Sequence, residues 1–161
     1  MSGKVTPAVT AARRAKIDFR VHERDTGDLD DELGYGPAAA VALDVDPARV
    51  HKTLVVRIGE QLAVAVVPVH RDADLKAVAA ALGTKKATMA ERADAERSTG
   101  YVIGGISPLG QRKRLPTVVD EDALAHDTVF ISGGRRGLEI ELTASDLIAL
   151  CRAAVAPIAT G

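Results

Sequence analysis

The sequence predicts an α+β fold: a single domain with a curled, mostly antiparallel mixed β-sheet, barrel-like in shape and flanked by short helices. Two patterns support this prediction. Runs rich in β-branched residues alternate with short amphipathic stretches that begin at helix-capping residues. Glycine-rich turns join neighbouring strands closely enough for antiparallel pairing. At 161 residues, with no internal repeat or long linker, the chain 1–161 has the size of one domain.

The first half of the chain gives signals for a helix, a strand and a central hairpin. Thr6 followed by Pro7 is typical of a helix N-terminus. Two apolar, β-branched runs flank the turn-like sequence GEQ, which predicts a hairpin at the centre of the sheet. The expected elements are a helix to about residue 15, a strand over 17–23, a loop over 24–37, a helix over 38–43, a turn at 46–47 and strands over 53–58 and 62–69.

The second half returns to helices before a final pair of strands. Asp72 or Asp74 caps a helix that ends at Gly83, and Thr143 with Asp146 resembles a capping box. The sequence TVFISGGRRGLEIEL is typical of strand, glycine turn and strand. The other expected elements are a helix over 89–96, a glycine-rich loop over 97–120 and a last helix over 147–156.

Composition excludes several classes of function. Twenty-one basic and 22 acidic residues give a net charge of −1, which argues against binding nucleic acid through overall charge. The short run Arg112 to Arg114 is either a local basic patch or a solvated loop. The single cysteine, Cys151, cannot form an intramolecular disulfide, and we expect it to be buried. The scattered histidines lack metal-ligand spacing, so we expect neither metal nor cofactor.

The chain carries no apolar run of signal-peptide or membrane-spanning length, so we expect a cytoplasmic protein that does not contact membranes.

Three stretches could carry chemistry. The loop RSTGYVIGGISPLGQRKRLPTVVD has glycines that allow close approach to a ligand, and a phosphate or nucleotide end is the first candidate. Lys52 in HKTLVV either faces water or holds a phosphate or carbonyl oxygen. The turn ISGGRRG is either an anion-binding nest or a hairpin turn with solvated arginines. The pattern alone does not decide between these interpretations.

Taken together and in order, these stretches resemble the YbaK family of bacterial Cys-tRNA(Pro) deacylases, which are related to the editing domain of bacterial prolyl-tRNA synthetases. The resemblance runs from Thr6 to about Ile158 through TPAV, HKTLVV, STGYVIGGISPLGQRKRLPTVVD and ISGGRRGLEIEL. It implies a hydrolase that removes cysteine from mischarged tRNA(Pro) in trans, beside prolyl-tRNA synthetase. The glycine-rich loop would then surround the 3′ aminoacyl-adenosine end.

The resemblance also implies roles for individual residues. Lys52 matches the family's essential lysine, and the thiol of the substrate cysteine would act as the nucleophile. Arg24 stands near a position where the family has a tyrosine, and Glu139 stands where it often has aspartate. The implied substrate-binding residues are Tyr35, Thr53, Gly104, Ile106, Ser107, Ser132 and Glu139. Two alternatives stay open: an Ala-tRNA(Pro) deacylase, and a non-catalytic module that binds a nucleotide or aminoacyl end.

Overall fold

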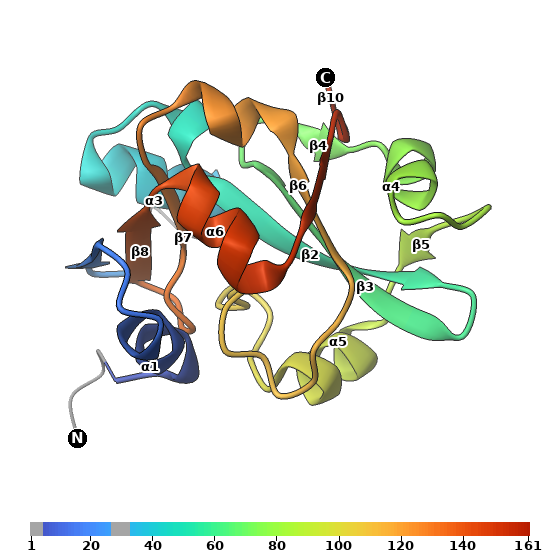
Figure 1. Ribbon diagram of the computed structural model, residues 1–161. Coiled ribbons are helices and arrows are strands. Elements are labelled where there is room, and N and C mark those ends of the chain that lie inside the picture. Colours follow the sequence, from blue (N-terminus) through green and yellow to red (C-terminus); the bar gives the residue numbers. More distant parts are fainter. Residues whose placement is uncertain (1–4, 27–32) are drawn as a thin grey trace.

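The computed structural model describes residues 5–26 and 33–161. Helices and sheets are mixed along the chain, as the sequence predicts (Figure 1). The helices are α1 (Pro7–Arg14), α3 (Tyr35–Leu43), α4 (Leu75–Ala81), α5 (Arg92–Thr99) and α6 (Ala144–Cys151), with 3-10 turns η1 (Pro47–Arg49) and η2 (Glu121–Ala125). The strands are β1 (Phe19–Glu23), β2 (His51–Ile58), β3 (Gln61–Pro68), β4 (Asp72–Ala73), β5 (Thr88–Met89), β6 (Thr117–Asp120), β7 (Val129–Ser132), β8 (Leu138–Leu142), β9 (Ala154–Ala156) and β10 (Ala159–Thr160).

The β2–β3 hairpin is the centre of the fold, and it confirms the predicted hairpin. The two strands pair antiparallel over their whole length, from His51 opposite Pro68 to Ile58 opposite Gln61. Gly59 makes the turn with a φ of +65°, a conformation that glycine adopts without steric cost. Almost all of β3 is buried, so its side chains pack into apolar clusters on both faces of the sheet.

Strand β6 lies inside the segment that we expected to be a loop. It pairs parallel to β3, and β9 in turn pairs parallel to β6. All four residues of β6 are buried, so its sequence TVVD lacks the polar and apolar alternation that marks a half-buried strand. The glycine-rich loop therefore ends before Thr117, and the five-stranded sheet has the order β5-β2-β3-β6-β9.

The prediction of a barrel-like sheet is wrong, because the described strands form three separate sheets. The second sheet has the order β1-β8-β7, and the third consists of β4 and β10. The main sheet ends in β5, which pairs with β2 through only two residues, and in the short strand β9. Within the described residues, one isolated bridge, between Val50 and Phe130, joins the N-terminal end of β2 to the second sheet. Edge strands this short cannot continue the hydrogen-bond ladder around a closed barrel.

Helix boundaries follow the predicted caps, with local corrections. The side-chain oxygen of Thr6 accepts a hydrogen bond from Val9 N, and that of Thr143 accepts one from Asp146 N, as predicted. Helix α3 begins earlier than expected, and α5 lies about three residues later. Helix α6 stops at Cys151, where Arg152 adopts a left-handed conformation, because the following residues pair with β6 as β9. This strand pairing overrides the apolar helical pattern that predicted a longer helix.

The main core lies between the five-stranded and three-stranded sheets, with residues of α1 and α6 packed into it. A second apolar cluster covers the other face of the main sheet, against α4. The buried Asp120 fixes the C-terminal segment, because its Oδ1 accepts hydrogen bonds from Ile158 N at 2.9 Å and Ala159 N at 3.0 Å. No helix in the described part of the chain is long and apolar enough to cross a membrane.

The first residue of β2 is a buried histidine. His51 is 3% exposed, its Nδ1 lies 3.3 Å from the carbonyl oxygen of Arg49, and its Nε2 has no hydrogen-bond partner among the described residues. Burial lowers the pKa of His51 from 6.5 to about 4. At neutral pH the imidazole is therefore uncharged.

This burial predicts a component of acid sensitivity. As the pH falls from 6.5 to 4, the unfolded chain binds a proton at His51 before the folded chain does, so stability is lost across this interval. The loss from this residue is on the order of 2 to 3 kcal/mol. Thermal melts of wild type and His51→Phe across this range should show that the variant lacks this loss, whereas the exposed His70→Phe control retains it. Parallel losses in wild type and His51→Phe would rule His51 out as the source.

Candidate active site

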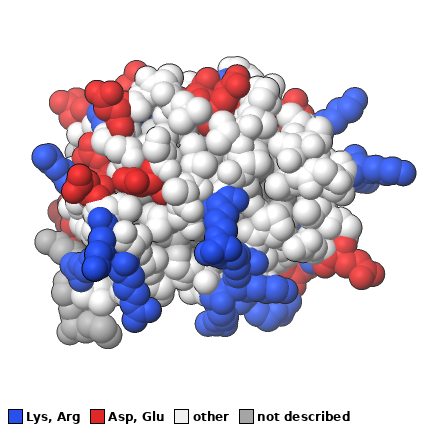
Figure 2. Space-filling view, in the orientation of Figure 1, with Lys and Arg blue, Asp and Glu red and all other residues white. Residues whose placement is uncertain are grey.

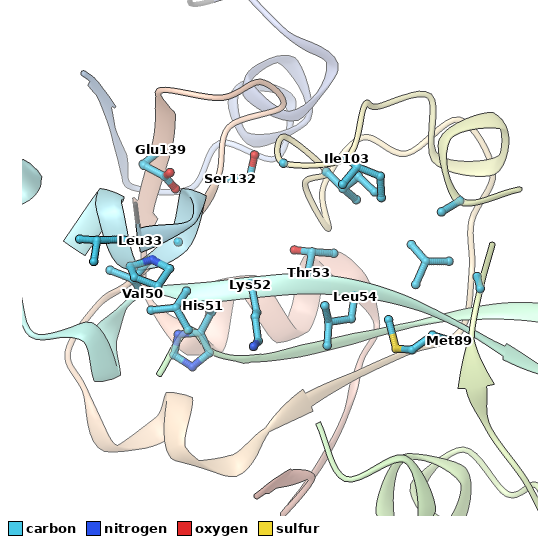
Figure 3. A pocket seen from close by; sticks show the side chains of 18 residues that line it. Leu33, Val50, His51, Lys52, Thr53, Leu54, Met89, Ile103, Ser132 and Glu139 are labelled. Atoms are coloured by element: carbon cyan, nitrogen blue, oxygen red, sulfur yellow. The ribbon is translucent and has the colours of Figure 1, made fainter. Parts of the chain in front are cut away.

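A cavity of about 450 Å³ lies beside the edge of β2 that faces away from β3 (Figure 3). Strand β5 covers this edge only at Val56 and Arg57, followed by a hydrogen bond from Ala90 N to Val55 O. Residues 51–54 are therefore left without a neighbouring strand on that side among the described residues. Peptide groups alternate in direction along a strand, so the main-chain groups of Thr53 point to the same open edge as those of Val55.

Lys52 and Thr53 leave β2 on opposite faces of the strand. Figure 3 shows Thr53 on the side of Ser132 and Ile103, and Lys52 on the other side with Leu54. Both side chains nevertheless line the cavity, because the cavity extends around the open edge of the strand. The buried Oγ1 of Thr53 has no hydrogen-bond partner in the described part of the molecule. A ligand in this cavity would therefore meet an unused hydroxyl and a cation from adjacent residues.

The ammonium of Lys52 has only a weak partner in the part of the chain that the structure describes. Its Nζ lies 3.6 Å from Oδ1 of Asp72, whose side chain is 89% exposed. An ion pair with a solvated carboxylate contributes little, so Lys52 can exchange this contact for a ligand at small cost. Lys52, Glu139 and His51 are the ionisable residues among the described lining residues, and His51 is neutral at pH 7.

Ser132 and Glu139 close the cavity from the second sheet. They lie directly opposite each other in the β7–β8 pairing, so both side chains are on one face. Ser132 Oγ accepts a hydrogen bond from Gly134 N at 3.1 Å, which fixes the orientation of the hydroxyl. Glu139 is buried although it is a carboxylate. The second sheet thus presents two polar groups toward the open edge of β2.

The segment Ile103–Ile106 forms the third wall, and two features hold its backbone. Glu96 in α5 accepts a hydrogen bond from Ile103 N at 2.8 Å. A Cβ at Gly105 would lie 2.7 Å from the Cα of Arg135, so only glycine allows this contact between the loop and the β7–β8 turn. Gly104 has a φ of +94°, which also favours glycine. The loop therefore presents its main chain to the cavity.

Most of the predicted site residues meet in this cavity. Lys52, Thr53, Gly104, Ile106, Ser132 and Glu139 all line it. Ser107 does not: it is fully buried, and its Oγ accepts a hydrogen bond from Leu109 N, so it stabilises the loop from inside. Tyr35 begins α3, and its side chain lies outside the described part of the structure. Arg24 is not among the described lining residues.

Sequence reasoning missed several lining residues. His51, Leu54 and Met89 contribute to the cavity walls, and Glu96 supports its loop. Leu54 lies in the predicted strand 53–58 and His51 lies two residues before it, so knowledge of an open strand edge at this position would have identified both. Nothing in the sequence signals Glu96, because its role depends on a contact across seven residues that only the folded loop creates.

Two other candidates from the sequence, the glycine turn of ISGGRRG and Cys151, do not contribute a free anion-binding or nucleophilic group to the cavity. Gly133 N donates to Leu138 O at 2.7 Å and Gly134 N donates to Ser132, which favours a hairpin turn over an anion nest. Cys151 lies in α6, where its Sγ contacts Pro108 O at 3.5 Å. Cys151 is half-buried rather than fully buried as expected, and desolvation raises the pKa of its thiol to about 12, which makes it a poor nucleophile at neutral pH. Within the described residues no cluster of His, Cys, Asp and Glu could hold a metal ion.

The hydrogen bond from Ile103 to Glu96 gives a prediction about the loop. Glu96→Ala should expose Ile103 N to solvent and speed hydrogen exchange at residues 102–106 roughly tenfold, the effect of losing a bond to a charged acceptor. Glu96→Gln retains a carbonyl oxygen and should exchange nearly as slowly as wild type. Exchange followed by mass spectrometry of this peptide provides the measurement. Equal exchange in Glu96→Ala and wild type would show that the bond does not restrain the loop.

Comparison with known proteins gives the family. The family model described as the aminoacyl-tRNA editing domain matches residues 37–150 of this chain. Over 157 residues, 96% of this chain and 93% of the other, the sequence is 34% identical to the Enterococcus faecalis (strain ATCC 700802 / V583) protein named "Putative Cys-tRNA(Pro)/Cys-tRNA(Cys) deacylase EbsC".

Solved structures show the same fold. One, described as "a putative trans-editing enzyme for prolyl tRNA synthetase", is 24% identical with a TM-score of 0.86, and the match covers 100% of this chain and 99% of that one. Another, described as hypothetical protein APE2540, is 21% identical with a TM-score of 0.85 and covers 96% and 100% of the two chains. The family match and the sequence identity show that this chain belongs to the family of aminoacyl-tRNA editing domains.

Proposed function

We propose that this protein hydrolyses the aminoacyl ester of Cys-tRNA(Pro) in trans. The observation that carries the proposal is the cavity at the open edge of β2, which has mainly apolar walls and is lined by Lys52. Its volume of about 450 Å³ is in the range of small-ligand sites. The relative that is 34% identical over nearly the whole chain carries the name of a Cys-tRNA deacylase, which supports the same substrate.

The lining residues suggest how the ester is held. Lys52 would stabilise negative charge that develops on the carbonyl oxygen, since a charge in a partly apolar site acts more strongly than in water. The Oγ1 of Thr53, unpartnered within the described residues, and the Ser132 hydroxyl would bind polar groups of the aminoacyl-ribose. The main chain at Gly104 would limit the size of the amino acid on the third side.

The nucleophile would come from the substrate. The thiol sulfur of the esterified cysteine attacks its own carbonyl carbon, and the C–O bond to the ribose breaks. The ribose oxygen takes up the proton lost by the thiol, and water then opens the cyclic thioester to release cysteine. This order of steps requires no protein thiol, which agrees with the position of Cys151 outside the cavity. Proline has no thiol, so correctly charged tRNA would be spared.

Prolyl-tRNA synthetase would supply the choice of tRNA. The chain has a net charge of −1, and basic groups such as Arg112–Arg114 are confined to short exposed runs. A surface of this kind does not select one tRNA by overall electrostatic attraction. Working in the cytoplasm beside the synthetase, the protein would capture the mischarged 3′ end as it is released.

The direct test is deacylation by purified protein without synthetase. Cys-tRNA(Pro) should lose its cysteine much faster than in buffer, while Ala-tRNA(Pro) and Pro-tRNA(Pro) persist. Cys-tRNA(Cys) should react at a rate similar to Cys-tRNA(Pro), because the amino acid and not the tRNA is recognised. Faster release of alanine would replace the proposal with an Ala-tRNA(Pro) deacylase. Binding of the 3′ end without hydrolysis of any ester would indicate the non-catalytic module.

Lys52→Ala tests the assigned cation. We expect kcat/KM for Cys-tRNA(Pro) to fall by about a hundredfold or more, the usual cost of removing a group that stabilises the transition state. The melting temperature should change little, because the ammonium makes only a weak contact with Asp72. Lys85→Ala, an exposed lysine outside the cavity, is the matched control and should retain full activity. Near-normal turnover by Lys52→Ala would remove Lys52 from the mechanism.

A further inference from the structure

A second groove, with a volume of about 380 Å³, adjoins the candidate active site. Ile103 lines both cavities, Gly104 lines the first and Gly105 lines the second. The segment 103–105 is therefore the wall between them. Gly105 also packs closely against the backbone at Arg135, so this segment contacts the β7–β8 turn that lines the groove. A ligand longer than the first cavity could continue across this segment into the groove.

The groove is cationic. Its described lining residues include Arg92 from α5 and Arg135 and Arg136 from the β7–β8 turn, and none of them is acidic. Oε2 of Glu96 lies 3.5 Å from Nε of Arg92, and Glu23 forms an ion pair with Arg135. These pairs are on the surface and leave the guanidinium groups able to rearrange toward a stronger anion. Guanidinium groups match the oxygen geometry of phosphate.

The rim of the groove is apolar on one side. Val102 is 65% exposed and Ile103 is 41% exposed, so two large aliphatic side chains lie open to solvent beside the arginines. Aliphatic groups of this kind can pack against the flat face of a base or a ribose. Phosphate-binding cations beside an exposed apolar rim together fit a nucleotide better than a free inorganic anion.

Charge is distributed unevenly around the molecule although the net charge is close to zero. On the face seen in Figure 2, many Lys and Arg side chains lie along the lower left and lower centre, with others at the upper right, while Asp and Glu lie mainly at the upper left and top, with a further group at the lower right. In the orientation of Figure 1, the lower left and lower centre contain α1 and the loop that precedes β6. A polyanion that entered the arginine groove would thus meet further positive charge, including the exposed Arg112–Arg114.

We propose that the arginine groove binds the phosphodiester backbone of the nucleotides just before the terminal adenosine of the aminoacylated RNA. The inference rests on the proposed function, because it takes the first cavity as the site of the aminoacyl ester. The chain of the RNA leaves that ester through the ribose, and this groove is the cationic surface that adjoins the first cavity across segment 103–105. Its arginines hold the RNA in register without touching the reacting bond.

The test separates the groove from the reaction by using two substrates. Arg92→Ala and Arg136→Ala should each raise KM for Cys-tRNA(Pro) roughly tenfold, as expected when one charged hydrogen bond to the RNA is removed, with kcat little changed. Hydrolysis of 3′-O-cysteinyl-adenosine, which has no phosphate, should be unaffected. In a plot of log KM against the logarithm of the salt concentration, the slope should decrease by about one for each phosphate that the variant no longer binds. Lys85→Ala serves as the control for a distant cation.

Two outcomes would overturn the inference: equal loss on both substrates, which would mean that the arginines support the first cavity, or no loss on either. Binding of a labelled, uncharged RNA ending in CCA gives a readout that needs no catalysis. Wild type should bind it more tightly than either arginine variant. If the wild type hydrolyses neither substrate but this difference in binding is observed, the deacylase proposal fails and the groove remains. If all proteins bind the RNA equally, the groove does not bind it.

Discussion

The open edge of β2 is the constraint on which both the fold and the candidate site depend. One edge of this strand pairs with β3 along its whole length, which fixes its register and its position in the core. The other edge pairs with β5 only at Val56 and Arg57. Unpaired main-chain groups in a sheet need another partner, and an exposed edge is a hazard for aggregation. Here the second sheet and the segment Ile103–Ile106 enclose that edge in a cavity, so the strand that stabilises the sheet also provides the floor of the site.

The remaining walls must be held in place by other means, because they come from distant parts of the chain. The second sheet meets β2 through the bridge between Val50 and Phe130, and pairing within β7–β8 places Ser132 beside Glu139. The loop wall is fixed at Ile103, whose N–H donates to the carboxylate of Glu96, and at Gly105, which packs closely against the backbone of Arg135. Rigid pairing thus positions the side-chain groups, while glycine contacts position the main chain. A site held this way needs little reorganisation when a ligand enters.

The sequence predicted local structure well where the pattern and the packing agree. Caps at Thr6 and Thr143 and the β2–β3 hairpin follow from side-chain chemistry and periodicity. It failed where long-range pairing decides the conformation: β6 is buried on both faces and shows no alternation, and β9 ends α6 early. The candidate site followed the same rule. Lys52 and Ser132 could be named from family motifs, but their meeting in one cavity and the support from Glu96 depend on tertiary contacts.

In the proposed scheme the first cavity would carry the chemistry and the arginine groove the recognition of RNA, because the two place charge in different surroundings. Lys52 lines a cavity with mostly apolar walls, and its side chain is 31% exposed, so its charge would act over a short distance on an ester held in that cavity. The arginines of the groove lie at the surface, where their attraction for phosphate is broad and weakens as ionic strength rises. Moderate salt should therefore loosen the hold on the RNA before it alters the chemistry at the ester. Under this proposal a weakly held RNA would leave after one cleavage, while the cavity would discriminate by the chemistry of the amino acid.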